Sequence, residues 1–355
     1  MKKILLLLFT MFLTTAFTAC GGETDEPEAI DTLILYSNQV SGGRGARLQT
    51  MISDAGFEFS VEIVELSAQN LKNRLVAEKA APIADVVLGG GMLEHLALKS
   101  EGVTKPFFPT WLNKIDGALL DDEGYYSPWS IEPLLLVYNK AHYTDDDNLV
   151  SSSLKKAPTD YQDLADNFVG EYNVFKPSSG TGATIYASVL LDYRDTSGDI
   201  GIGQEGWDLL DSLLNGGEID RGLWQMNLAG SEKPISMTWA GAIIEIEAAY
   251  GIELGIVEPE AGVPYVVSQV AVINSGNSAR EAAAKQFVEW WGQTATQVAW
   301  SAISGQAPAN RDAFDLVDEQ VQEISNINAI QLDWEFIVEN ISDWRQKIEL
   351  DIIRN

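Results

Sequence analysis

Short apolar segments alternate with amphipathic ones along most of the 355-residue chain, and this alternation constrains the fold more than any other feature. In the first half, apolar runs with strand composition lie at 32–36 (TLILY), 59–66 (FSVEIVEL) and 84–88 (ADVVL). Apolar residues at helical spacing follow these runs at about 46–54, 68–79 and 92–100. Strands that alternate with helices in this way predict an α/β protein with mixed, mostly parallel sheets.

The second half of the chain repeats this alternation. Its strand-like runs are the latter part of 125–139 (YYSPWSIEPLLLVYN), 174–175, 234–239 (PISMTW) and 264–273 (PYVVSQVAVI). Helices are predicted at 183–193, 207–214, about 242–250 and 282–300. Hydrophobic residues make up 46% of the chain, which over this length is enough for two buried cores. Trp334 and Trp344 lie at helical spacing among apolar neighbours and are predicted to be core.

The N-terminus indicates the compartment. Lys2 and Lys3 precede an apolar stretch that is too short to span a membrane and is typical of a cleaved signal peptide. Cys20, at the end of the small residues that follow, resembles the lipobox cysteine of a bacterial lipoprotein. That resemblance implies a signal peptide over 1–19, lipidation at Cys20, and a protein anchored to a membrane and facing the periplasm or the exterior. Residues 20–30 (CGGETDEPEAI) are predicted to be a flexible tether.

Charge and cysteine content exclude several classes of partner. Lys and Arg number 23 against 52 Asp and Glu, for a formal net charge of −29 at pH 7. Nucleic acid is therefore not an expected partner, because neutralising phosphates requires clustered Lys and Arg. Cys20 is the only cysteine, so no disulfide or cysteine-based metal site is expected in the mature chain.

Small, donor-rich residues follow four of the predicted strands. Ligands of open parallel sheets bind beyond the carboxyl ends of the strands, where such loops gather. Glycines let backbone amides approach a ligand, and hydroxyls can donate to its oxygens. In the stretch 178–183 (SSGTGA), these residues directly precede a helix, whose positive end favours an anion. The candidate ligand-binding residues are Ser37, Asn38, Gly90, Gly91, Trp129, Ser178, Ser179, Gly180, Thr181, Gly182, Trp239 and Ala240.

Each of these features also has a purely structural interpretation. Ser178 or Ser179 can be an ordinary helix N-cap. Three consecutive glycines at 89–91 can simply mark a tight turn between a strand and a helix. Trp129 and Trp239 can pack in a core. Their positions at matching strand ends favour the functional interpretation.

Six segments in this order resemble the extracellular solute-binding proteins of ABC importers, in the branch that contains ferric-iron, phosphonate and hexose-phosphate binders. The segments are LILYSN, AEKAAPIADVVLGGG, YSPWSIEPLLLVYN, PSSGTG, GQAPANRDA and WEFIVENISDWR. The resemblance implies a two-lobed periplasmic-binding-protein fold of the type II kind, with a hinge of two crossing strands near 131–137 and 266–271. It implies a first lobe over 31–133, a second over 134–268, and a return to the first lobe with C-terminal helices over 269–355. The implied partners are a small-molecule ligand and an ABC permease with its ATPase.

The resemblance also bears on the ligand. Its ferric-iron branch uses two adjacent tyrosines in the second lobe, with a histidine and a carboxylate from the first. The corresponding segment here, SMTWAGAIIEI, has no tyrosine pair, and His95 and His142 are expected on the surface or on a helix face. No metal site is therefore predicted. The predicted ligand is a small phosphorylated or phosphonylated metabolite, with its charged group at Ser37, Ser179, Gly180 and Thr181 and its organic part against Trp239 and Trp129.

Two other ligand classes stay open at this point. One is iron carried with a chelating anion. The other is a cation, such as a polyamine or a thiamine-like compound, for which Glu132, Glu245 and Glu247 are candidate contacts.

Enzyme motifs do not support catalysis. Residues 201–206 (GIGQEG) match a dinucleotide-binding pattern but follow a polar loop instead of a buried strand. A P-loop lysine, HExxH and GxSxG are absent from the sequence. We therefore expect a binding protein without a cofactor, with a secreted lyase or phosphatase as the remaining alternative.

Overall fold

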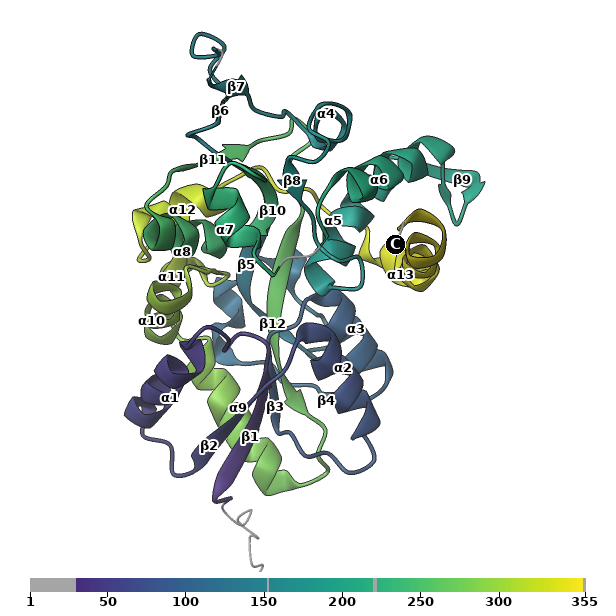
Figure 1. Cartoon of the computed structure of the whole chain (residues 1–355). Helices are drawn as coiled ribbons and strands as arrows, with labels where there is room; N and C mark the ends of the chain where they lie inside the picture. The colour runs from purple at the N-terminus through teal and green to yellow at the C-terminus, as the bar shows by residue number, and fades with distance from the viewer. Residues whose placement is uncertain (1–29, 152, 220–221, 354–355) are drawn as a thin grey trace, which may run out of the picture.

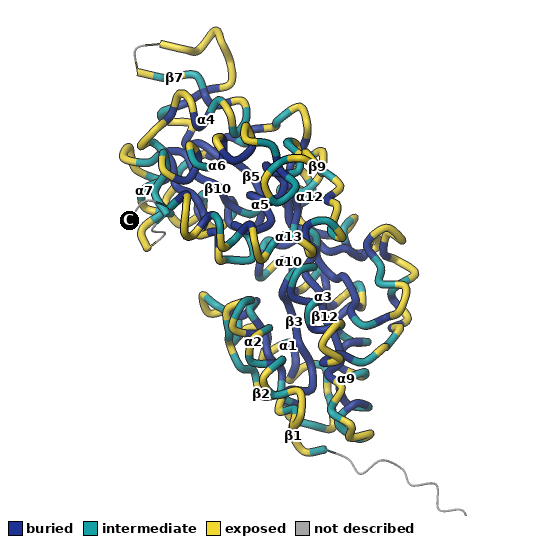
Figure 2. The backbone as a smooth tube through the Cα atoms, turned by 90° about the vertical axis from the view of Figure 1, so that its right-hand side faces the viewer, coloured by how far each residue is buried: buried dark blue, intermediate teal, exposed yellow. Residues whose placement is uncertain are grey.

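The computed structural model describes residues 30–151, 153–219 and 222–353, which form two lobes (Figure 1). Figure 2 shows each lobe with a buried interior and a narrower region between them. The predicted signal peptide, Cys20 and tether residues 21–29 lie outside the described residues. Within the described part, none of the helices has the length and apolar character that crossing a bilayer requires.

Lobe 1 is built on parallel strands followed by helices. Strands β1 (Thr32–Ser37), β2 (Ser60–Glu65) and β3 (Val86–Leu88) are parallel, and β12 (Tyr265–Ile273) joins β3 in the antiparallel sense. Apolar side chains cover both faces of this sheet, which explains why β1 and β3 are almost continuously hydrophobic, whereas β2 at the edge alternates with polar residues. The helices of lobe 1 are α1 (Arg44–Ala55), α2 (Ala68–Ala77), α3 (Met92–Ser100), α9 (Ser278–Trp291), α10 (Thr294–Ser304) and α11 (Arg311–Phe314).

Lobe 2 is assembled around the second half of β5 (Ser127–Asn139). This half pairs antiparallel with β10 (Ile235–Trp239) and β11 (Leu254–Val257), while β8 (Tyr172–Asn173) is parallel to β10. The helices that cover the sheet are α4 (Tyr161–Asn167), α5 (Gly180–Leu191), α6 (Gln204–Gly216), α7 (Trp224–Ala229) and α8 (Ala240–Tyr250). The short elements are β4 (Thr104–Lys105), β6 (Tyr143–Thr144), β7 (Lys155–Lys156), β9 (Arg194–Asp199), β13 (Ala307–Pro308), η1 (Thr110–Lys114), η2 (Gly117–Leu119) and η3 (Ile348–Ile352).

Strand β5 carries the chain from one lobe to the other. Its first half pairs with β12, up to the Pro133–Tyr265 pair, and its second half pairs with β10 from Leu134 onward. The chain returns to lobe 1 through residues 258–264 and β12. The structure therefore joins the lobes through one mixed sheet, in which the crossing strands run antiparallel to each other.

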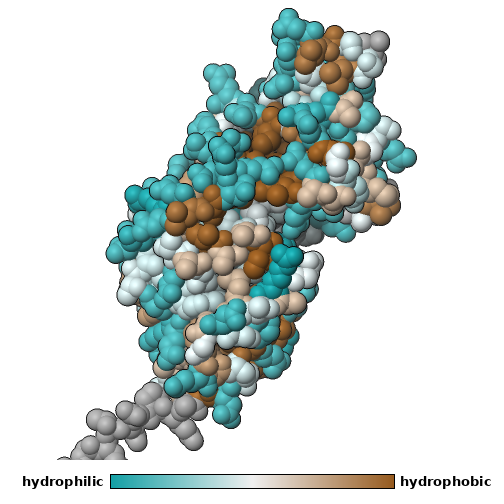
Figure 3. All heavy atoms as spheres, turned by 90° about the vertical axis from the view of Figure 1, so that its left-hand side faces the viewer, coloured by the Kyte–Doolittle hydropathy of each residue, from teal (hydrophilic) through white to brown (hydrophobic). Residues whose placement is uncertain are grey.

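The chain makes a third passage that the sequence did not indicate. After β13 and α11, helices α12 (Glu319–Ser325) and α13 (Trp334–Lys347) pack on lobe 2. Ile337 and Trp344 of α13 belong to the core of lobe 2, so this helix is part of that lobe. Figure 3 views the side on which the lobes meet near α10 and α12, and hydrophobic side chains gather there among hydrophilic ones. A small cluster that contains Ala307, Val317 and Val321 packs at this junction.

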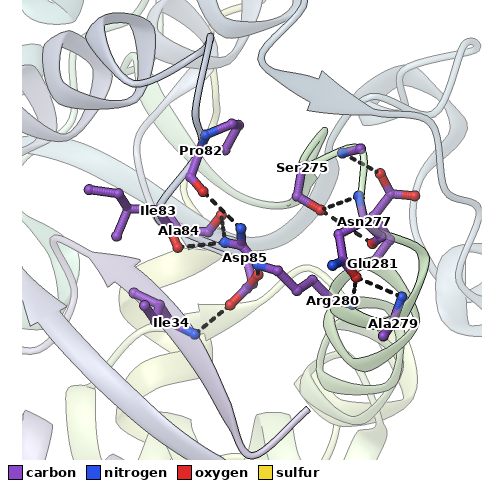
Figure 4. A network of polar contacts seen from close by, with 11 residues as sticks. Ile34, Pro82, Ile83, Ala84, Asp85, Ser275, Asn277, Ala279, Arg280 and Glu281 are labelled. Carbon is purple, nitrogen blue, oxygen red and sulfur yellow. Dashed lines mark hydrogen bonds and ion pairs between the residues drawn. The ribbon is translucent and has the colours of Figure 1, made fainter. Parts of the chain in front are cut away.

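An ion pair between the buried Asp85 and the partly exposed Arg280 connects strands and a helix of lobe 1 (Figure 4). Arg280 Nε of α9 lies 2.5 Å from Asp85 Oδ1, and Asp85 Oδ2 accepts a hydrogen bond of 2.7 Å from the Ile34 N–H. The guanidinium also donates to the carbonyls of residues 82–84 at 2.6–3.1 Å. Burial raises the pKa of Asp85, while the bonds from Ile34 and Arg280 oppose that change. Because the charges are hydrogen-bonded on both sides, the pair holds β1, β3 and α9 in one arrangement.

Candidate functional site

A cavity of about 230 Å³ lies between the lobes and is lined from both. Lobe 1 contributes the loops that follow β1 and β3, and lobe 2 contributes the start of α5 and Trp239 at the end of β10. The crossing strands β5 and β12 also line it, together with Gln306 before β13 and Trp334 at the start of α13. The volume is below the roughly 300–1,000 Å³ of drug-sized sites, so it suits a small metabolite.

Six helices begin at this cavity. Its lining includes the first residues of α1, α2, α3, α5 and α13, which are Arg44, Ala68, Met92, Gly180 and Trp334. It also includes Trp239, the N-cap residue of α8. The first N–H groups of a helix have no partner within the helix, and the helix dipole makes this end positive. The helix N-termini therefore add positive potential at a cavity whose lining also contains the carboxyl groups of Glu94 and Glu132.

Some residues of the turn before α5 cap this helix, and others line the cavity. Ser179 is the N-cap: its Oγ accepts a 3.0 Å hydrogen bond from Gly182 N–H and donates one of 2.7 Å to the Lys176 carbonyl. A Cβ at Gly182 would lie 2.3 Å from that carbonyl oxygen, so the turn requires glycine there. Gly180 and Thr181 line the cavity, whereas Ser178 lines a separate groove beside α3 and α13.

The glycine turn after β3 is held by side chains from α3 and the first loop. Gly89 and Gly90 have φ values of +102° and +74°, which favour glycine. Gly90 N–H donates to Asn38 Oδ1 at 3.0 Å, and His95 Nε2 donates to the Gly89 carbonyl at 2.8 Å. His95 was expected on the surface or on a helix face; it lies on α3, and its side chain is completely buried. Burial lowers its pKa to about 4, so the ring is neutral at pH 7.

A carboxylate of lobe 1 reaches the start of α5 in lobe 2. Glu94 Oε2 accepts a 2.9 Å hydrogen bond from Gly91 N–H at the beginning of α3. Its Oε1 lies 3.4 Å from the position that a Cβ would have on Gly180. Glu94 is buried and lines the cavity. An internal anion therefore lies between the N-termini of α3 and α5.

A chain of polar side chains forms another wall of the cavity. Gln306 Nε2 donates to Glu132 Oε2 at 2.8 Å and to Gln39 Oε1 at 2.9 Å. Gln39 Nε2 in turn donates to Asn38 Oδ1 at 3.2 Å and to Ser268 Oγ at 3.4 Å. These bonds connect β5, β12 and the loops of lobe 1, so the wall is rigid.

The remaining sequence-predicted residues lie behind the cavity lining. Ser37 is buried and its Oγ accepts a hydrogen bond from Gln39 N–H. Trp129 is 1% exposed, donates to the Gln269 carbonyl and packs edge-on against Trp291 in the core of lobe 1. Ala240 is the first residue of α8 and is buried. Of the predicted set, Asn38, Gly90, Gly91, Gly180, Thr181 and Trp239 line the cavity.

Sequence reasoning did not place Glu94, Gln306 or Trp334 in the site. Gln306 lies in the GQAPANRDA segment that carries the family resemblance, but no local pattern marks it as a lining residue. Trp334 reaches the cavity because α13 packs on lobe 2. Within residues 30–151, 153–219 and 222–353, no group of three or more His, Cys, Asp or Glu side chains is placed to hold a metal ion.

Comparison with known proteins assigns the family. Residues 52–329 match the family model described as bacterial extracellular solute-binding protein. The chain belongs to this family. A probable ABC transporter periplasmic-binding protein, y4fP of Sinorhizobium fredii, is 29% identical over 330 residues, which cover 92% of this chain and 88% of the relative. This solute-binding protein is therefore the substrate-binding component of an ABC transporter, and its partners are a small-molecule ligand and a permease with its ATPase.

Solved structures share the fold of this solute-binding protein. The ferric binding protein from Campylobacter jejuni superimposes with a TM-score of 0.72 at 19% identity, over 90% of this chain and 99% of that one. AfuA from Actinobacillus pleuropneumoniae, solved with fructose-6-phosphate, gives 0.72 at 18% identity, over 90% and 99%. At such identities the likeness concerns the two-lobed α/β fold alone.

Proposed function

We propose that this solute-binding protein captures a small organic anion, a phosphorylated or phosphonylated metabolite, and delivers it to its permease. The observation that carries the proposal is the convergence of six helix N-termini on one cavity. Such N-termini bind anions through backbone N–H groups and the helix dipole. They act locally, so they can hold an anion despite the net charge of −29.

The lining suggests how such a ligand lies. Gly180 and Thr181 present the first N–H groups of α5 and a hydroxyl to the oxyanion. Arg44 is the one basic side chain among the described lining residues, and it adds a charged donor from α1. Trp239 and Trp334 offer aromatic surface for the organic part.

A cationic ligand is the second candidate, because Glu94 and Glu132 line the same cavity. The two candidates differ in what Glu94 does. For an anionic ligand, Glu94 competes for the N–H groups of α3 and α5. For a cationic ligand, Glu94 is a direct partner. Iron with a chelating anion stays a prediction of the family resemblance.

Ligand-induced thermal stabilisation tests the proposal. The protein from Glu23 onward, freed of co-purified ligand, is screened against sugar phosphates, phosphonates, inorganic phosphate, ferric citrate, polyamines and thiamine. A ligand at 100 times its Kd adds about 2.7 kcal/mol to the free energy of unfolding, a clear shift in Tm. We expect stabilisation by a phosphorylated or phosphonylated compound.

The variant Glu94→Gln separates the two ligand classes. It keeps an oxygen that can accept from Gly91 N–H but removes the negative charge beside Gly180. Anion affinity should rise by about threefold or more, since a like charge is removed at close range. Glu339→Gln, which makes the same charge change on an exposed part of α13, is the control. If Glu94→Gln, but not Glu339→Gln, lost affinity for the ligand that stabilises the protein, the site would instead be assigned to a cation.

A further inference from the structure

We propose that Glu132 determines ligand specificity by accepting a hydrogen bond from an ammonium or hydroxyl group on the part of the ligand away from its anionic group. This inference rests on the proposed function, because it deepens the description of the same ligand. Glu132 lies on β5 where the strand passes between the lobes, opposite Val266 of β12. Its side chain lines the cavity.

The neighbours of Glu132 leave one of its oxygens without a donor. Oε2 accepts from Gln306, but Oε1 is buried and has no hydrogen-bond partner among the described residues. Gln306 cannot supply a second bond, because its two amide hydrogens go to Glu132 and Gln39. Its own carbonyl oxygen accepts from Trp300 Nε1 at 2.9 Å, which fixes the orientation of the amide.

The charged groups around Glu132 do not donate a hydrogen bond to its Oε1. Arg44 of α1 lines the same cavity and favours the ionised carboxylate of Glu132, but its guanidinium donates to the carbonyl and Oγ of Ser41. Glu94 of α3 lines the cavity, and Glu245 of α8 acts on Glu132 as a second negative charge. Burial raises the pKa of Glu132. A buried polar atom without a partner is destabilising and rare in proteins, so it points to a ligand that supplies the donor.

The ligand class follows from joining the two halves of the cavity. An oxyanion lies at the helix N-termini, and a donor group lies at Glu132. The ligand is therefore an amino- or hydroxy-substituted phosphate ester or phosphonate. An ammonium group adds a charge pair to the hydrogen bond, whereas a hydroxyl group adds the hydrogen bond alone.

Three probes with the same three-carbon chain isolate the donor. Propyl phosphate, 3-hydroxypropyl phosphate and 3-aminopropyl phosphate share the anion and differ only at the far end, and inorganic phosphate reports the anion site alone. Calorimetric titration of the wild-type protein should show at least one of the donor-bearing esters bound about tenfold tighter than propyl phosphate. The ester that gains affinity tells an ammonium site from a hydroxyl site.

The variant Glu132→Gln should abolish this preference. It keeps an oxygen for Gln306 but places an amide donor where Oε1 lay, so a ligand donor is no longer accepted. Affinity for propyl phosphate should stay within about threefold of the wild-type value. Glu339→Gln, an equal charge change at an exposed residue of α13, should keep the tenfold preference.

The melting temperature of the ligand-free protein provides an independent readout. If Glu132 serves the ligand, Glu132→Gln should leave Tm unchanged or raise it, because a buried charge with an unpaired oxygen is removed. A fall in Tm of several degrees would assign Glu132 to the fold and overturn the inference. Phosphate esters that bind without any donor preference would also overturn it, while the proposed function survives. Binding of none of the phosphates would overturn the proposed function itself.

Discussion

His95 is a single residue whose burial makes the stability of the glycine turn depend on pH. Its Nε2 holds the Gly89 carbonyl, and burial lowers its pKa from 6.5 to about 4. As the pH falls from about 6.5 to 4, the unfolded chain takes up a proton that the folded protein resists. The free energy of unfolding should therefore fall by at most roughly 3 kcal/mol through this window. Below about pH 4, His95 should cause no further change.

The variant His95→Gln isolates this contribution. Its amide can still donate to the Gly89 carbonyl, but it does not titrate. Urea unfolding between pH 7 and pH 4 should show the wild-type protein losing more stability than the variant. Parallel losses in the two proteins would contradict the buried, neutral histidine, because all other titrating groups are shared.

Within the first turn of helix α5, one residue caps the helix and another lines the cavity. Ser179 Oγ caps the helix through Gly182 N–H, whereas Thr181 lines the cavity. Ser179→Ala should therefore lower the free energy of unfolding by about 1 kcal/mol. Thr181→Ala should weaken binding of the stabilising anion by about tenfold while the ligand-free Tm stays nearly constant. Calorimetric titration and thermal unfolding of both variants check this contrast; an unchanged affinity in Thr181→Ala would remove the hydroxyl from the site.

Local sequence patterns predicted some of the helices and strands and missed others. Apolar periodicity predicted β1, β2, β3 and the helices that follow them. It placed the start of α5 three residues late, at 183 instead of Gly180, because Gly180–Gly182 form the first turn without apolar periodicity. The strand β9 (RDTSGD) was not predicted, because polar residues such as Asp and the glycine within it are depleted in strands.

The candidate site was predictable only where it depends on strand ends. The loops after β1, β3 and β10 and the turn before α5 all reach the cavity, as the rule for parallel sheets led us to expect. Glu94 was not predicted because it lies within a helix, and its approach to Gly180 depends on how the lobes meet. Trp334, assigned to the core by its helical spacing, packs against the core of lobe 2 and also lines the cavity, because α13 docks on that lobe.

For the whole molecule, the net charge of −29 opposes the approach of an anion, although the cavity itself favours one. Added salt screens the long-range repulsion, since the Debye length falls from about 30 Å at 0.01 M to about 8 Å at 0.15 M. The helix N-termini contact the bound ligand directly and are screened less. The association rate of an anionic ligand should therefore increase with ionic strength.

Stopped-flow fluorescence can measure this rate, because Trp239 and Trp334 line the cavity and should respond to a bound ligand. Between 0.01 M and 0.15 M salt we expect the association rate constant to rise by about twofold or more, with a smaller change in the dissociation rate. A neutral salt that does not itself stabilise the protein is the appropriate background. An association rate that falls with salt would mean that the acidic surface attracts the ligand. In that case the carboxylates of Glu94 and Glu132, and not the helix N-termini, would be the groups that hold a cationic solute.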